Sequence, residues 1–171
     1  MWPWGHLAFG YLLGSGWKRL DDGRPLTRGE ALALALGTQF PDAVDKPLAW
    51  TWGLLPSGRS LAHSVFTALA VLVGASFVPD DRPAGAYVEA FAVGWLSHLL
   101  GDALRPAFRR RPSRLRFLAW PLTATDREVE GGFQEVFGRL ERTDLYGPEA
   151  AVVAVAVAWW ARRWLPGSAH E

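Results

Sequence analysis

Three of the four histidines lie beside polar residues at the ends of apolar segments, where metal or acid–base chemistry would be expected. His6 opens the first segment, His63 lies near the start of the third, and His98 lies near the end of the fourth. Asp42 and Asp45 directly follow the second segment. The chain has no cysteine, so any metal must be held by nitrogen and oxygen ligands. Imidazole with carboxylate suits Zn, Mn, Fe or Ni.

The local spacing of these residues favours shared ligation. His98 and Asp102 are four residues apart, which on a helix places both side chains on one face, one turn apart. They could share an ion, or Asp102 could orient His98 through its other ring nitrogen. Asp42 and Asp45 are three residues apart directly after Pro41, so they can bend toward one ion or bridge two.

Five apolar segments, rich in Ala and Leu and without polar alternation, predict an all-α protein, an up-and-down bundle of about five helices. The expected helices are 4–17, 28–40, 60–78, 85–104 and 148–165. Pro41 is expected to end the second helix because proline disfavours helical geometry in the residue before it. Ser60 is a candidate N-cap of the third helix.

Threading the chain up and down gathers the candidate residues. If successive helices alternate in direction, the start of the first, the end of the second, the start of the third and the end of the fourth share one end of the bundle. Six potential ligands then converge: His6, Asp42, Asp45, His63, His98 and Asp102. Such a mixed, open site suits hydrolysis, because a metal lowers the pKa of bound water and stabilises a developing oxyanion.

Three of the five segments approach the roughly 20 residues that a helix needs to cross a bilayer. We therefore expect a single helical membrane domain over 1–171: a motif-bearing part at 1–104, a basic polar loop at 105–147 and a last hydrophobic helix at 148–166. The loop contains a plausible amphipathic helix around 129–140. The first two segments are shorter, so they are tilted spans, half-helices inside the bundle, or buried helices of a soluble protein.

The charge distribution bears on partners and orientation. With 18 Lys+Arg against 17 Asp+Glu, the net charge of +1 gives no reason to expect a nucleic-acid partner. Arginines in the 105–147 loop outnumber those of the opposite loops, so the positive-inside rule predicts a multi-pass protein of the cell membrane whose site faces the cytoplasm. Interleaved Arg, Phe and Trp in that loop suit lipid headgroups, and a solvated basic loop is the alternative.

Four motifs in this order resemble the YdjM-like family of membrane-bound metal-dependent hydrolases. They are GHLA at 5–8, FPDAVD at 40–45, GRSLAHS at 58–64 and GWLSHLLGD at 94–102. Their family patterns are G-H-x-x, L-P-D-x-D, H-R-G-x-T-H-S and G-x-x-S-H-x-x-x-D. The chain departs from the third pattern at Gly58, which stands in place of the first histidine and removes one candidate ligand or base. Arg59 and Ser64 are retained.

The leading hypothesis is a metal-dependent hydrolase at the membrane interface, with the six convergent residues as ligands and zinc as the first expectation. Asp42 or Asp45 could act as general base instead of ligand, and Arg59 could hold an anionic group of the substrate. The substrate is an unknown small or lipid-like molecule, for which a phosphoester would suit the metal. Two alternatives stay open: a non-enzymatic membrane protein with a structural polar or metal-binding network, and a soluble helical metalloenzyme.

Overall fold

The computed structural model describes residues 1–77, 83–125 and 147–164, and every regular element in these ranges is helical. The predicted all-α class is therefore confirmed, and each of the five predicted segments contains an α-helix. The α-helices are α1 (Pro3–Asp21), α2 (Arg28–Lys46), α3 (Val65–Ala75), α4 (Pro83–Phe108) and α6 (Pro148–Trp164). A π-helical turn, η1 (Pro47–Thr51), follows α2, and a 3-10 helix, η2 (Pro112–Ala119), follows α4. The amphipathic helix expected around 129–140 lies outside the described residues.

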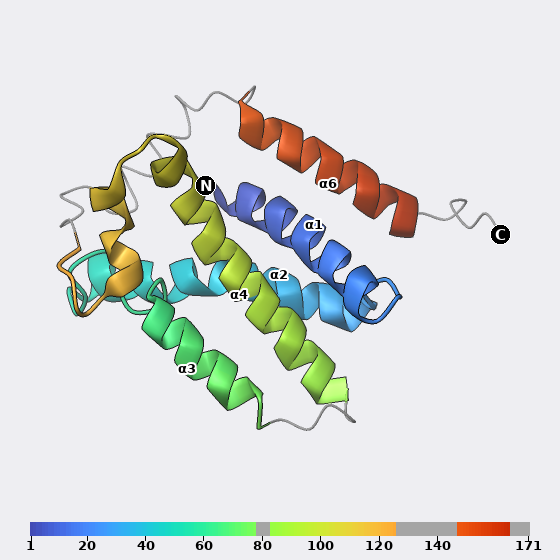
Figure 1. Cartoon of the computed structure of the whole chain (residues 1–171), viewed down its shortest axis with the longest axis horizontal. Coiled ribbons are helices and arrows are strands. Elements are labelled where there is room, and N and C mark those ends of the chain that lie inside the picture. The colour runs from blue at the N-terminus through green and yellow to red at the C-terminus, as the bar shows by residue number, and fades with distance from the viewer. Residues whose placement is uncertain (78–82, 126–146, 165–171) are drawn as a thin grey trace.

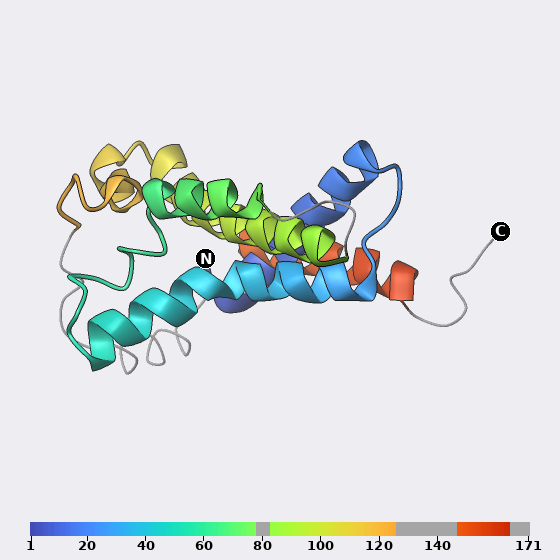
Figure 2. The ribbon, with the colours of Figure 1, turned by 90° about the horizontal axis from the view of Figure 1, so that it is seen from below.

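Helix α4 is the centre of the bundle. It packs against α1, α2, α3 and η2, while α6 packs on α1. Figure 1 shows α4 running between α1 and α3, and Figure 2 shows α2 in a second layer beneath α3 and α4. Helices α2 and α4 approach so closely that a Cβ at Gly37 would lie 2.1 Å from the Phe91 carbonyl oxygen, and one at Gly94 would lie 2.2 Å from the Leu34 carbonyl oxygen. The contact between the two site-bearing helices therefore requires glycine.

Helix α2 corrects the prediction that Pro41 ends the second segment. The helix begins with a capping box, in which Thr27 and Glu30 exchange hydrogen bonds between side chain and backbone, and it continues through Pro41 to Lys46. Proline inside a helix costs about 3 kcal/mol because it removes one hydrogen bond and crowds the preceding turn. The packing of α2 on α4 and the burial of the Pro41 side chain offset this cost. Asp42 and Asp45 consequently lie on the helix, not in a bend after it.

The third segment also differs from its prediction, because α3 starts at Val65 and residues 60–64 are not helical. The Asp45 carboxylate accepts the backbone N–H groups of Ser60, Ala62 and His63, which fixes this stretch as a buried loop. The N-cap is Ser64, whose hydroxyl accepts from the backbone N–H of Phe66. A carboxylate from another helix thus decides where α3 begins.

The fourth helix is longer than expected, because α4 continues through Pro106 to Phe108. None of the helices within the described ranges has both the length and the apolar character that a bilayer span requires. Helix α3 has 11 residues and α6 has 17, against the roughly 20 that a span needs, and Glu89 and Asp102 interrupt the apolar sequence of α4.

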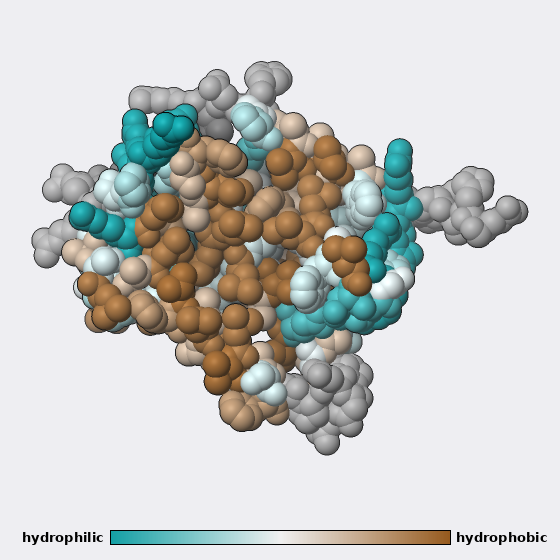
Figure 3. Space-filling view, viewed as in Figure 1, coloured by the Kyte–Doolittle hydropathy of each residue, from teal (hydrophilic) through white to brown (hydrophobic). Residues whose placement is uncertain are grey.

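A broad apolar surface covers the face of the molecule seen in Figure 3, over the region where α1, α3 and α4 lie in Figure 1. These helices carry large apolar side chains that stay exposed, including Leu13, Leu69, Val73, Leu96 and Leu100. Isolated exposed apolar residues are ordinary on soluble proteins, but contiguous apolar surface marks a contact with lipid or another macromolecule.

Candidate metal centre

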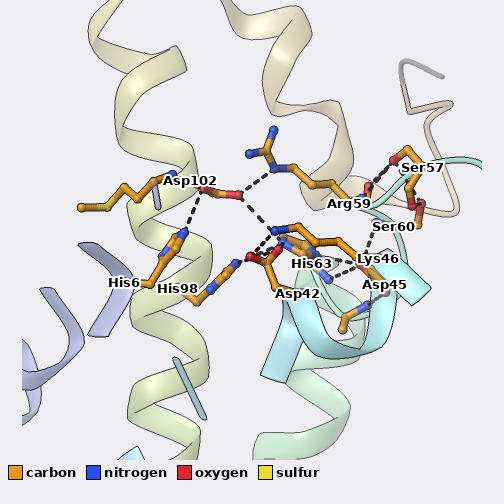
Figure 4. A network of polar contacts seen from close by, with 12 residues as sticks. His6, Asp42, Asp45, Lys46, Ser57, Arg59, Ser60, His63, His98 and Asp102 are labelled. Carbon is orange, nitrogen blue, oxygen red and sulfur yellow. Dashed lines mark hydrogen bonds and ion pairs between the residues drawn. The ribbon is translucent and has the colours of Figure 1, made fainter. Parts of the chain in front are cut away.

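The candidate residues meet at one end of the bundle, as Figure 4 shows. The first turn of α1 supplies His6, the last turns of α2 supply Asp42 and Asp45, the loop before α3 supplies His63, and the second half of α4 supplies His98 and Asp102. Five of them are buried, and Asp42 is partly exposed. The alternating helix directions that the sequence suggested do bring these six side chains together.

Three atoms form a triangle of the size that a metal ion requires. His63 Nε2 lies 3.1 Å from His98 Nε2 and 3.5 Å from Asp42 Oδ1, and His98 Nε2 lies 3.8 Å from the same oxygen. In a tetrahedral site with bonds of about 2.0–2.1 Å, neighbouring ligand atoms are about 3.3–3.4 Å apart. Among the residues that the structure describes, these three form one of two groups whose ligand atoms lie close enough to hold an ion.

The hydrogen bonds behind the two histidines determine which ring nitrogens face the triangle as acceptors. His98 Nδ1 lies 2.6 Å from the Thr38 carbonyl oxygen, which can only accept, so this nitrogen carries the proton. His63 Nδ1 lies 2.8 Å from Asp45 Oδ2 and donates in the same way. In the neutral rings both Nε2 atoms then bear lone pairs that face each other, an arrangement that repels unless a proton on one ring or a metal ion lies between them. The donor set therefore fits a metal ion.

Asp45 lies behind His63 and not in the triangle. Its two oxygens accept four hydrogen bonds, from His63 Nδ1 and from the backbone N–H groups of Ser60, Ala62 and His63. A carboxylate that accepts from the distal nitrogen of a ligating histidine fixes its tautomer and ring orientation. The geometry gives Asp45 this orienting position, although the sequence alone allowed it to be a ligand or a base.

A second group shares His98 with the first. His6, His98 and Asp102 also place one ligand atom each within reach of a single ion. His6 Nε2 lies 3.3 Å from Asp102 Oδ1, and the rings of His6 and His98 stack with centroids 3.7 Å apart. His6 Nδ1 is buried and has no hydrogen-bond partner among the described residues. Because His98 has one unprotonated nitrogen, that nitrogen can belong to only one of the two groups at a time.

Hydrogen bonds and nearby cations keep Asp42 and Asp102 ionised. Burial alone would raise the pKa of Asp42, but its hydrogen bond to His63 and the charge of Lys46 outweigh burial and hold the pKa below its usual range. Burial likewise opposes ionisation of Asp102, and the guanidinium of Arg59 is the largest of the effects that lower its pKa. Arg59 Nε donates to Asp102 Oδ2 at 2.7 Å, and Lys46 Nζ donates to Asp42 Oδ2 at 2.5 Å.

The pKa values of the two buried histidines His98 and His63 shift in opposite directions. Burial, reinforced by the nearby His6, lowers the pKa of His98 to about 3, so its ring is neutral at physiological pH. Burial would also lower the pKa of His63, but hydrogen bonds to Asp42 and Asp45 raise it instead. A neutral His98 is in the state that binds a metal ion, and His63 would exchange its extra proton for the ion.

Sequence reasoning missed Lys46 and Trp50. Lys46 follows Asp42 by four residues, an ion-pair spacing that becomes visible only once α2 is known to pass Pro41. The Lys46 ammonium lies 5.7 Å from the centroid of the Trp50 ring. A Cβ at Gly58 would come within 2.9 Å of that ring, so Trp50 fills the space beside the position where the family motif has histidine.

Comparison with known protein families covers nearly the whole chain. The family model described as YdjM inner membrane protein matches residues 1–166. No curated protein and no solved structure matches the chain. The match covers all of the candidate ligands and extends well beyond the four motifs.

Proposed function

Because this chain belongs to the YdjM family of inner membrane proteins, we propose that it is a metal-dependent hydrolase with its ion among Asp42, His63 and His98. His6 and Asp102 lie beside this triangle. The observation that carries the proposal is the pair of Nε2 atoms 3.1 Å apart, each directed at the other by an acceptor behind its ring. A divalent ion supplies Lewis acidity, which acidifies bound water and stabilises developing negative charge.

The residues of the chain have distinct tasks in this proposal. Thr38 and Asp45 hold the rings of His98 and His63 in the ligating tautomer. The lowered pKa of Asp42 keeps it ionised at neutral pH, so that it can ligate the ion or accept a proton from water. The buried position of the cluster limits access of bulk water. Nitrogen-rich ligation with a carboxylate favours zinc, with Mn, Fe or Ni as alternatives.

Elemental analysis of the purified, untagged protein tests the metal site. We expect close to one ion per chain, because both candidate groups need the same nitrogen of His98. His63→Ala and His98→Ala should lose the ion, while Asp21→Ala, at an exposed position on the last turn of α1, should retain it. Retention of the ion by both histidine variants would contradict the assignment.

Hydrolysis is tested separately with the loaded protein. Phosphoesters, carboxylic esters and amides are screened with the ion found by elemental analysis, and turnover should disappear in His98→Ala. The competing candidate is a non-enzymatic membrane protein with a metal-binding or structural polar network, and the replacement of the family histidine by Gly58 favours it. A protein that binds metal and gains thermal stability from it, but hydrolyses none of these compounds, would support that candidate.

The family description supports localisation to the membrane. The exposed apolar face over α1, α3 and α4 is the surface that we propose contacts lipid. The multi-pass arrangement and the cytoplasmic location of the site stay predictions from the sequence, and the location follows from the arginines of the 105–147 loop.

A further inference from the structure

Two cations lie on the solvent side of the buried ligand cluster. Lys46 is bonded to Asp42, and Arg59 is bonded to Asp102. The side chains of Lys46 and Arg59 are 25% and 42% exposed, whereas that of Asp102 is 2% exposed. Figure 4 shows both cationic side chains extending toward the cluster from the same side. A molecule that approaches the buried ligands from solvent on this side therefore meets positive charge first.

Both cations are connected through a carboxylate to the same ring nitrogen. Asp42 accepts a hydrogen bond from Lys46 through Oδ2, and its Oδ1 lies 3.5 Å from His63 Nε2. Asp102 places Oδ2 on Arg59, and the same oxygen lies 3.9 Å from His63 Nε2. One carboxylate thus separates each cation from the atom at the centre of the candidate metal site.

The positive charge of the site increases when an ion binds. The site carries three carboxylates, those of Asp42, Asp45 and Asp102, against three cations, which are Lys46, Arg59 and the N-terminal ammonium of Met1. With neutral histidines these charges cancel, and a divalent ion leaves two net positive charges. In a partly buried site this charge is poorly screened, so the loaded site attracts an anion more strongly than the metal-free site does.

We propose that Lys46 and Arg59 form an anion-binding pair and that the site takes a phosphate ester; this rests on the metal-dependent hydrolase proposed above. An ion, an ammonium and a guanidinium offer three points of attachment, which suit the several charged oxygens of a phosphate better than the two of a carboxylate. A guanidinium matches phosphate oxygens in planar, paired geometry, and an ammonium binds them as a point charge.

Trp50 positions the lysine of this pair. Its ring lies beside the Lys46 ammonium and occupies the space next to Gly58. A cation over an aromatic face is held in place, which reduces the conformational entropy lost when an anion binds. The glycine at position 58 thereby leaves room for the aromatic ring that holds Lys46, and we expect this chain to bind the phosphate through lysine on that side of the site.

Calorimetric titration with inorganic phosphate tests the pair. Metal-loaded wild type should bind phosphate more tightly than metal-free wild type does. Lys46→Met and Arg59→Met should each weaken phosphate binding about tenfold or more when the affinity is measured on samples reloaded to the metal content of wild type, and Lys46→Arg should recover most of the affinity because it retains the charge. Arg162→Met, at an exposed position of α6, is the matched control and should bind as wild type does.

The outcomes separate this inference from the proposed function. Metal retained in all variants with phosphate affinity unchanged in Lys46→Met and Arg59→Met would overturn the anion-binding pair and leave the metal site intact. Failure of the wild type to bind any ion would overturn both. A second titration compares glycerol phosphate with phosphatidic acid in the detergent micelles of the preparation. Tighter binding of the lipid would assign the phosphate to a lipid headgroup, and equal binding would assign it to a soluble ester. Either result supports a phosphate ester as the substrate class.

Discussion

Asp45 has the most hydrogen bonds of the site carboxylates, and its position behind His63 gives it two functions at once. It fixes the tautomer of a candidate ligand, and it holds the backbone of the loop that carries that ligand. Asp42, three residues earlier on the same helix, instead presents one oxygen to the ring nitrogens and the other to Lys46. Identical side chains on one helix turn therefore have different roles because their partners differ.

Asp45→Asn tests the orienting role. Asparagine has a single acceptor oxygen, so at least one buried N–H group loses its partner, and we expect the free energy of unfolding to fall by about 1–3 kcal/mol. Metal affinity should fall about 10–100-fold, as is typical when an outer-shell carboxylate is removed. Chemical denaturation and metal titration measure the two effects. Asp42→Asn is the comparison: it should lose more metal affinity and less stability, and the reverse order would contradict the assignment.

At the scale of elements, the site depends on how closely α2 and α4 approach. Their contact at Gly37 and Gly94 leaves no room for a Cβ, and these helices supply Asp42, Asp45, His98 and Asp102. A change in the distance between the helices would therefore move the carboxylates of one relative to the histidine of the other.

Gly94→Ala should reduce stability by about 1–3 kcal/mol through overpacking and should weaken metal binding in parallel. Gly16→Ala is the matched control, because a Cβ there meets nothing within 4 Å and Gly16 lies inside α1. It should raise stability by about 0.5–1 kcal/mol, the difference between Gly and Ala in a helix. Thermal unfolding of both variants gives the comparison, and a Gly94→Ala protein as stable as wild type would refute the close contact.

The far end of α2 is stabilised by an ion pair that responds to acid. Glu30 accepts from both terminal nitrogens of Arg24 and from the backbone N–H of Thr27. The hydrogen bonds from Arg24, opposed by burial and aided by Thr27, lower the pKa of Glu30 from its usual 4.5 to about 2. A lowered native pKa stabilises the fold above the unfolded value and loses that contribution as the pH falls.

Between pH 4.5 and about 2, the free energy of unfolding of wild type should fall as Glu30 becomes protonated. We therefore expect a smaller fall over this range in Glu30→Gln, which has no carboxylate to protonate. Because Arg24 is substantially exposed, the difference should be modest. Denaturant unfolding of both proteins at a series of pH values measures the difference. Equal slopes in wild type and Glu30→Gln would mean that the pair contributes nothing to folding.

For the molecule as a whole, the polar cluster and the apolar face have separate roles. The candidate ligands gather at one end of the bundle, and exposed apolar side chains extend over α1, α3 and α4. The chain belongs to a family of inner membrane proteins, and we propose the lipid bilayer as the partner of this face.

Single cysteines test the arrangement in the membrane, because the natural chain has none. Ser113→Cys lies in η2 near the site, and Asp21→Cys lies at the opposite end of α1. If the sequence-based orientation is right, a membrane-impermeant maleimide labels Asp21→Cys in sealed spheroplasts and labels Ser113→Cys only after lysis. Labelling of both positions before lysis would contradict the multi-pass arrangement, and the opposite pattern would reverse the orientation.

The sequence by itself determined the helical class, the family, and which residues could be ligands, because these depend on local composition, spacing and order. Only the tertiary structure decided the course of the chain at Pro41 and at 60–64, since packing and a distant carboxylate outweigh local preferences there. It also decided that Asp45 orients His63 and that Lys46 joins the site. Such roles follow from hydrogen bonds between distant parts of the chain, which no local pattern encodes.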